Sequence, residues 1–159
     1  MLIELPIAEI ILLNAAAWLL IQFGLAWGLT RFPAKCFNAR SPLAQLWRWE
    51  KSGRAYEKIF TIKRWKDSLP DGARWLGDAF SKAGLRQRTP EFYEQFLRET
   101  WRGEVVHWLA LLTVPVFAIW NPPWAVALNG LYALAANLPC ILVQRYNRSR
   151  FLRVLNHGA

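Results

Sequence analysis

The chain has 159 residues, of which 54% are hydrophobic and ten are tryptophan, and it carries 20 Lys and Arg against 11 Asp and Glu. This length suits one domain, and so apolar a composition beside so many charges excludes an ordinary soluble globular protein. A net charge of +9 is typical of nucleic-acid binders, but the cations flank long apolar runs. We therefore expect membrane topology to explain the charge, and no nucleic-acid partner.

Residues 7–30 form the first apolar run, IAEIILLNAAAWLLIQFGLAWGLT, in which Glu9 is the only charged residue. Its length predicts a transmembrane helix, because crossing the hydrocarbon core takes about 20 residues. A cleaved signal peptide is the alternative, since AAA at 15–17 resembles a cleavage site. The segment has no basic start, stays apolar past that point and precedes Arg31, so we predict an uncleaved anchor.

Residues 31–104 form a cytoplasmic amphipathic region between the apolar runs. Within it, the Ser-Pro pair that opens 41–53 is a cap signal, and it predicts a short helix ending at Gly53. Over 59–64, Ile59, Thr61 and Lys63 alternate with Phe60, Ile62 and Arg64, which predicts a strand or a flattened surface segment. A second cap signal, at 89–90, predicts a helix that continues into the membrane.

A second apolar block, at 105–143, is interrupted by NPPW, which predicts a helical hairpin with arms at 105–120 and 124–143. At 1.5 Å per residue the first arm spans only about 24 Å. It therefore begins before residue 105, thins the bilayer locally, or dips into it without crossing. A basic cytoplasmic tail at 144–159 follows the hairpin.

The cations set the orientation, because all of them lie in residues 31–102 or 145–153 and none in residues 1–30. The positive-inside rule then puts the N-terminus outside and both basic regions in the cytoplasm. Three crossings satisfy this arrangement. We predict a single all-α integral membrane domain over residues 1–159, consisting of an N-terminal anchor, a cytoplasmic amphipathic helical segment and a C-terminal helical hairpin.

The stretch ETWRGEVVHW, residues 99–108, places two carboxylates and a histidine where the second apolar block begins. On a helix, Glu104 and Glu99 flank His107, and a carboxylate beside an imidazole fixes its tautomer and raises its basicity. That arrangement suits a general base. In the alternative, these residues have a structural role only: Glu99 pairs with Arg102, and His107 belongs to a row of polar side chains. The depth of His107 favours function, because a polar group inside a membrane arm is costly.

A second polar cluster, NLPCILVQRYNRSR at 137–150, closes the last arm. Arginines alone predict a flank that binds anionic lipid phosphates, whereas amide and phenol groups interleaved with them favour a site that recognises hydroxyls or phosphates by geometry. Because the hairpin folds back, this cluster and residues 99–108 lie at similar depth and can meet. We expect Glu50 and residues 64–67 to close the pocket from the cytoplasmic side.

These motifs resemble those of the glycosyl-4,4'-diaponeurosporenoate acyltransferase family, bacterial membrane proteins that esterify the sugar of staphyloxanthin-type carotenoids. The resemblance covers most of the chain, and its further motifs are TRFP at 30–33, WEKSGR at 49–54 and RWKDSLPDG at 64–72. It implies a multi-pass protein of the bacterial cell membrane that transfers an acyl group to a glycosyl hydroxyl. It also implies an activated acyl donor and a glycosylated carotenoid or related glycolipid as partners, beside anionic membrane lipid.

The resemblance also implies the site residues. Those expected to bind substrate are Glu50, Trp65, Lys66, Asp71, Arg102, Asn137, Gln144, Arg145, Asn147, Arg148 and Arg150. In the expected mechanism His107, oriented by Glu104 or Glu99, deprotonates the sugar hydroxyl. Arginines 145, 148 and 150 hold the phosphates of the donor, and Asn137 or Gln144 donates to the oxyanion. We expect no cofactor and no bound metal.

Two alternative functions remain open at this stage. EVVH, at 104–107, is also the Glu-x-x-His pair of carboxylate-bridged di-iron bundles, so a metal-dependent lipid-modifying enzyme is one of them. The other is a non-catalytic membrane adaptor that binds anionic lipid through the tail arginines, in which His107 has no role.

Overall fold

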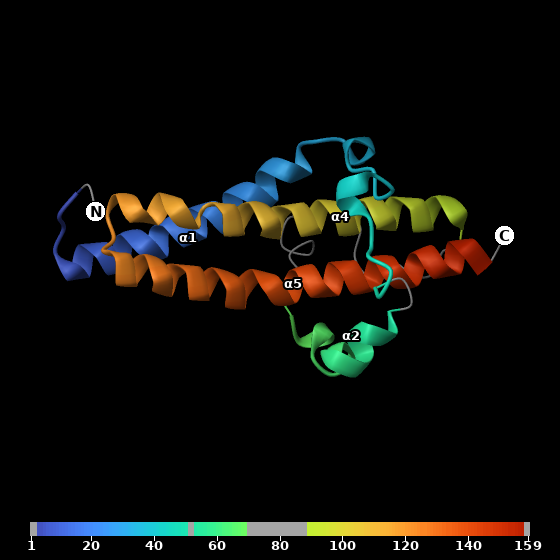
Figure 1. The fold of residues 1–159 in the computed structure, drawn as a ribbon. Helices are drawn as coiled ribbons and strands as arrows, with labels where there is room; N and C mark the ends of the chain where they lie inside the picture. The colour runs from blue at the N-terminus through green and yellow to red at the C-terminus, as the bar shows by residue number, and fades with distance from the viewer. Residues whose placement is uncertain (1–2, 51–52, 70–88, 158–159) are drawn as a thin grey trace.

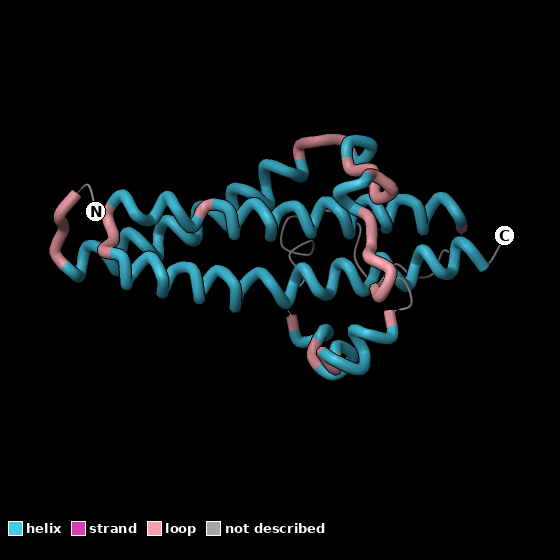
Figure 2. The backbone as a smooth tube through the Cα atoms, viewed as in Figure 1, coloured by secondary structure: helices cyan, strands magenta, loops and turns pink. Residues whose placement is uncertain are grey.

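The structure, a computed structural model, describes residues 3–50, 53–69 and 89–157, and these form helices and loops without a strand (Figures 1 and 2). Three long helices lie side by side. They are α1 (Ile7–Thr30), α4 (Pro90–Leu112) and α5 (Pro123–His157). The short 3-10 helix η6 (Val114–Ile119) continues α4 towards the turn into α5. The predicted all-α fold is confirmed.

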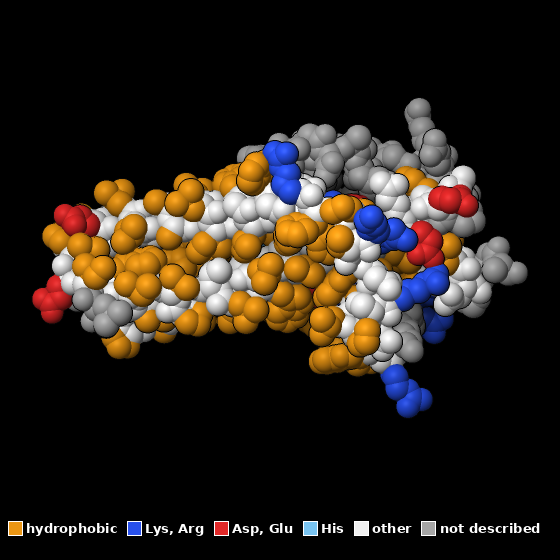
Figure 3. Space-filling view, turned by 90° about the horizontal axis from the view of Figure 1, so that it is seen from above, with side chains coloured by type: hydrophobic (Ala, Val, Ile, Leu, Met, Phe, Trp, Pro, Cys, Tyr) orange, Lys and Arg blue, Asp and Glu red, His pale blue; other side chains and the backbone are white. Residues whose placement is uncertain are grey.

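All three long helices are long and apolar enough to cross a membrane, over Ile7–Thr30, Glu91–Ile119 and Pro123–Asn156. Hydrophobic side chains cover most of the visible surface of the bundle, while Lys and Arg gather towards the end where α5 finishes (Figure 3). The 35 residues of α5 extend for about 52 Å at 1.5 Å per residue, well beyond a hydrocarbon core of about 30 Å. Its basic final turns therefore project from the membrane.

The start of α4 agrees with the cap signal, because the Thr89 hydroxyl accepts a hydrogen bond from the Phe92 amide at 3.3 Å and Pro90 is the first helical residue. The apolar arm at 105–120 is therefore the second half of a longer element. Deeper in the membrane, Trp18 of α1 stacks on Phe117 at 4.8 Å, and both pack against Ala133 of α5. These contacts hold α1 against the hairpin.

The region after α1 contains short turns rather than the two elements predicted there. They are η1 (Ala34–Cys36), η2 (Pro42–Ala44), α2 (Arg54–Ile59), η3 (Ile62–Arg64) and η4 (Lys66–Ser68). The helix predicted over 41–53 is wrong beyond η2, because the Glu50 carboxylate accepts the Trp47 amide and folds the chain back on itself. The strand predicted over 59–64 is also wrong.

Packing against α5 explains why a helical turn replaces that strand. Tyr56 and Ile62 are fully buried and share a cluster with Val143 and Tyr146 of α5. In a strand the two side chains would share a face but lie about 20 Å apart. The end of α2 at Ile59 and the turn at Thr61, with a φ of 45°, instead bring them together on α5. The segment thereby rests on the second half of α5 and brings Glu50 to the bundle.

Candidate active site

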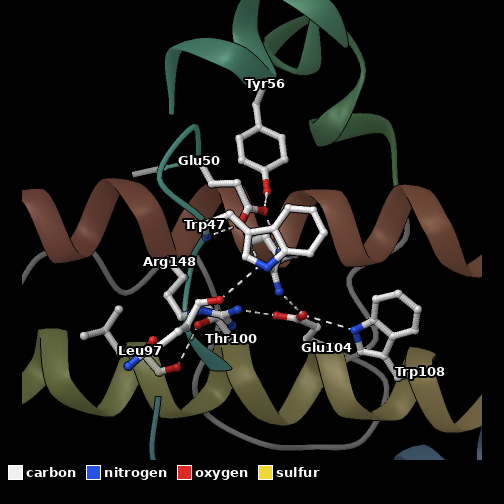
Figure 4. Close-up of polar contacts among 10 residues, drawn as sticks. Trp47, Glu50, Tyr56, Leu97, Thr100, Glu104, Trp108 and Arg148 are labelled. Carbon is white, nitrogen blue, oxygen red and sulfur yellow. Dashed lines mark hydrogen bonds and ion pairs between the residues drawn. The ribbon is translucent and has the colours of Figure 1, made fainter. Parts of the chain in front are cut away.

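Four charged side chains, three of them buried, meet where the segment between α1 and α4 touches α4 and α5 (Figure 4). Arg145 of α5 donates from Nε and Nη2 to the two oxygens of Glu50, each at 2.7 Å, and from Nη1 to Glu104 of α4, also at 2.7 Å. Arg148 donates from Nη2 to the other oxygen of Glu104. Glu104 and Arg148 are 0% exposed and Glu50 is 2% exposed. Two carboxylates thus neutralise two guanidinium groups away from water.

Neutral donors complete this buried cluster. The Tyr56 hydroxyl and the Trp47 amide donate to Glu50, and Trp108 donates from Nε1 to Glu104 at 3.1 Å. Burial alone would raise the pKa of the Glu50 carboxyl, but the hydrogen bonds from Arg145, Tyr56 and Trp47 outweigh it and hold that pKa below its usual range. Burial and the nearby Glu50 carboxylate raise the pKa of Tyr56, so its hydroxyl stays protonated and donates.

Arg148 retains donors that no described residue accepts. Its Nε and Nη1 are buried without a hydrogen-bond partner in the described part of the chain, and its guanidinium lies over the Trp101 ring at 5.6 Å. Buried N–H groups without a partner are rare and costly. Arg145, by contrast, has its donors directed at Glu50, Glu104 and the Gln45 carbonyl. Of the two arginines, Arg148 is the one with capacity for a ligand.

His107 lies one turn deeper on α4, and its partner is an amide rather than a carboxylate. Its Nδ1 is 2.9 Å from Oδ1 of Asn137 on α5, and the same oxygen accepts a hydrogen bond from Gln22 Nε2 of α1 at 3.2 Å. The expectation that Glu104 or Glu99 orients His107 is therefore wrong. Glu104 is held by arginines, which neutralise it, and Glu99 pairs with Arg102 at 3.0 Å.

The hydrogen-bond network assigns the tautomer of His107. Asn137 donates from Nδ2 to the Ala133 carbonyl at 2.9 Å, so its Oδ1 is the atom that faces the imidazole. An amide oxygen only accepts, and therefore Nδ1 of His107 carries the proton. In the neutral ring this leaves the lone pair on Nε2, which makes no hydrogen bond within the described residues. His107 is half-buried, and its basic nitrogen is available to a substrate.

Gln144 lies against α4 one helical turn from His107. A Cβ placed on Gly103, four residues before His107, would lie 2.9 Å from Nε2 of Gln144. The missing side chain at Gly103 therefore leaves room for the Gln144 amide on α4. The structure thus brings Asn137 to His107 and Gln144 to Gly103, and these connections differ from those expected from the sequence.

The other predicted residues lie around this centre or outside it. Arg102 donates to the Phe32 carbonyl at 2.9 Å and ties the segment after α1 to α4. Trp65 packs against the Tyr56 cluster, and Lys66 pairs with Asp67 at 2.5 Å. The remaining three are Asn147, which is half-buried, Arg150, which is exposed, and Asp71, which lies outside the described residues.

Sequence reasoning missed two residues of the site, Tyr56 and Gln22. Tyr56 gave no signal, because it belongs to a short helix that the sequence pattern did not predict. Gln22 did give one, since it is an amide within an apolar run and a polar group there is costly without a partner. Over the described residues, no three or more His, Cys, Asp and Glu side chains come together to hold a metal ion, so the Glu104–His107 pair does not form the di-iron ligand set.

The chain is similar in sequence to known proteins that share one name. The sequence model for glycosyl-4,4'-diaponeurosporenoate acyltransferase matches residues 33–157. A protein of that name from Staphylococcus haemolyticus is 33% identical over 139 residues, which are 87% of this chain and 81% of the relative. Its counterpart from Staphylococcus aureus strain USA300 is 33% identical over 138 residues, 87% of this chain and 83% of the relative. No solved structure matches the chain significantly.

Proposed function

Because the chain belongs to the glycosyl-4,4'-diaponeurosporenoate acyltransferase family and is therefore an acyltransferase, we propose that it moves a fatty acyl group from an activated donor to a sugar hydroxyl. The acceptor we propose is a glycosylated carotenoid, as in the names of the Staphylococcus relatives, or a related glycolipid. The di-iron and adaptor alternatives find no support in the relatives or in the site.

The observation that carries the mechanism is the hydrogen bond from His107 Nδ1 to Asn137, which leaves Nε2 as the base. Nε2 takes the proton of the sugar hydroxyl while that oxygen forms a bond to the acyl carbonyl carbon. The carbonyl electron pair then returns, the bond to the leaving group breaks, and His107 gives its proton to that group. The products are the sugar ester and the free carrier, and the base is regenerated.

Gln144 is the proposed donor to the oxyanion. Both ends of the Asn137 amide are already engaged, with His107, Gln22 and the Ala133 carbonyl. The Gln144 amide has no hydrogen bond to a described residue, and it lies against Gly103, one helical turn from His107. A preorganised N–H aimed at the oxyanion commonly contributes about 3 kcal/mol to barrier lowering. Arg148, with two spare N–H groups, is the proposed contact for the anionic part of the donor.

The remaining predicted residues take positioning roles in this proposal. Glu50 and Glu104 hold Arg145 and Arg148 in place, and Arg102 with Glu99 fixes the segment after α1. The residues that we propose contact the acceptor or the lipid headgroups from the cytoplasmic side are Trp65, Lys66, Asp71, Asn147 and Arg150.

We further propose that the chain crosses the bacterial cell membrane three times, with the N-terminus outside. The cations of residues 31–102 and 145–153 then face the cytoplasm, where they attract anionic lipid at about 1 kcal/mol each. A cysteine-accessibility experiment tests this, using single cysteines introduced at Glu4 and at Lys58 in the Cys36→Ser, Cys140→Ser background. A membrane-impermeant thiol reagent added to intact cells should label the first position only.

Ester formation tests the function. Membranes containing the full chain, an acyl donor and a glycosylated carotenoid should give a product heavier by one acyl group in a mass spectrum of the extracted pigment. His107→Ala should lower this product at least about hundredfold, the usual contribution of a general base, while His157→Ala, at the second of the two histidines, should not change it. Undiminished product in His107→Ala would show that another group is the base.

A further inference from the structure

Polar contacts at three levels connect α1 to the turn before α5 and to α5 itself inside the apolar bundle. Asn14 donates to Asn121 at 2.9 Å, and Trp18 donates from Nε1 to Asn129 at 2.7 Å. The third is the hydrogen bond from Gln22 to Asn137 at 3.2 Å. The α1 residues are spaced by four, so each contact lies about one turn of α1 from the next. Their partners are spaced by eight, with Asn121 just before α5 and the other two on it. We call this set the amide ladder.

The three asparagines of the ladder have the same local geometry. Each donates from Nδ2 to the backbone carbonyl four residues earlier, at Phe117, Ala125 and Ala133, with distances of 2.9 or 3.0 Å. This back-bond holds one edge of each amide against η6 for Asn121 and against α5 for the other two, and it leaves each Oδ1 to accept from α1. At membrane depth such groups need partners, and the ladder provides them.

The contact from Gln22 to Asn137 differs from the others in one respect. The oxygen of Asn137 accepts from Gln22 and also from His107 Nδ1 on α4, so this contact joins all three long helices. The oxygen of Asn129 accepts from Trp18, and neither residue contacts the imidazole. The family model matches residues 33–157, so this match does not include α1. From the sequence, α1 is expected only to anchor the chain in the membrane.

We propose that Gln22 is a positioning residue of the active site, acting on His107 through Asn137. The proposal rests on the proposed role of His107 as the base. With Gln22 in place, the Asn137 oxygen is fixed where it receives the proton of His107 Nδ1. Without it, the Asn137 amide is held only by its bond to the Ala133 carbonyl and its contact with His107. The histidine then samples the tautomer with the proton on Nε2, and that tautomer has no lone pair to offer the sugar hydroxyl.

The experiment compares two variants of the full chain reconstituted in lipid nanodiscs. Gln22→Leu and Trp18→Phe each remove one hydrogen bond of the amide ladder, and only the first bond reaches Asn137. Gln22→Leu should lower kcat for ester formation about tenfold, the effect of one lost hydrogen bond, leave KM unchanged and shift the pH profile of kcat. Trp18→Phe should leave kcat and its pH profile unchanged. Equal kcat in the two variants, with one unchanged tautomer of His107 in Gln22→Leu, would overturn the proposal.

A double variant tests whether Gln22 acts through Asn137. Adding Gln22→Leu to Asn137→Leu should cause no further loss of kcat, since coupled residues are not additive. A full additional tenfold loss would overturn this route. If Gln22→Leu does not fold, Gln22→Asn serves instead, because it keeps the carboxamide and is one methylene too short to reach Asn137.

Nitrogen NMR of the histidine ring gives a readout that does not depend on activity. The chain has two histidines, so in a His157→Gln background the ¹⁵N signals belong to His107 alone. The parent and Trp18→Phe should show protonation at Nδ1 only, and Gln22→Leu should show both tautomers. One unchanged tautomer in Gln22→Leu would overturn the proposal. Mixed tautomers with unchanged ester formation would uphold the positioning and refute His107 as the base.

Discussion

Replacing Glu104 by Gln should destabilise the protein more than any exposed charge change. The substitution keeps the shape of the side chain but removes the charge that Arg145 and Arg148 share. Arg145 and the buried Arg148 then remain with Glu50 alone, and Glu50 pairs with Arg145. Arg148, which is 0% exposed, has no other carboxylate among the described residues. Breaking one partner of a buried pair costs about 3–5 kcal/mol, which is a large part of the stability of a small protein.

The assay is chemical unfolding of the detergent-solubilised protein, with Glu94→Gln as the control. Glu94 is on the same helix and pairs with Arg40, but both side chains are exposed to solvent, so its loss should cost less than about 1 kcal/mol. Replacing both Glu104 and Arg148 by leucine and methionine should recover much of the loss, since a neutral pair removes the stranded charge. Equal destabilisation by Glu104→Gln and Glu94→Gln would refute the reasoning.

Two further predictions concern pH and the close contact at Gly103. The pKa of Glu50 is lowered from its ordinary 4.5, so the ionised carboxylate contributes fully to stability above pH 4.5, and this contribution is lost as the pH falls through the lowered pKa. The melting temperature of the protein should therefore drop as the pH falls below 4.5, and the drop should be smaller in Glu50→Gln. Gly103→Ala should displace Gln144, whose Nε2 lies 2.9 Å from the new Cβ, and lower kcat up to about hundredfold. Gly28→Ala, with nothing within 4 Å, should leave kcat unchanged.

The long helices were predictable because their signal is strong and local. The apolar run at 7–30 is α1 residue for residue, since a membrane helix needs only length and hydrophobicity to form. The cap at Thr89 is likewise local. The region between the membrane helices was not predictable in this way, because burial of Tyr56 and Ile62 on α5 decides its conformation, and a short segment carries no pattern that reports a distant partner.

The candidate site shows the same division between local and distant information. Helical spacing placed His107 and Glu104 next to each other, and the hairpin brought Asn137 and Gln144 to them. Spacing alone did not reveal that Arg145 and Arg148 of α5 pair with the Glu104 carboxylate. The sequence therefore predicted a carboxylate, rather than the Asn137 amide, as the group that orients His107. An arginine about two or three turns beyond Asn137 competes for Glu104 only once the two helices are packed.

The separation of charged and neutral partners follows from the cost of burying each kind of group. An ionised side chain is far more expensive in hydrocarbon than an amide, so its cost falls if it lies near the polar end of the bundle. Glu104 and its arginines occupy that end, where the helices leave the membrane, while His107 lies deeper and is held by amides. A carboxylate partner at His107 would bring its charge one turn further in. A neutral amide orients the ring at lower cost, and it leaves the imidazole neutral, which is the form that a general base requires.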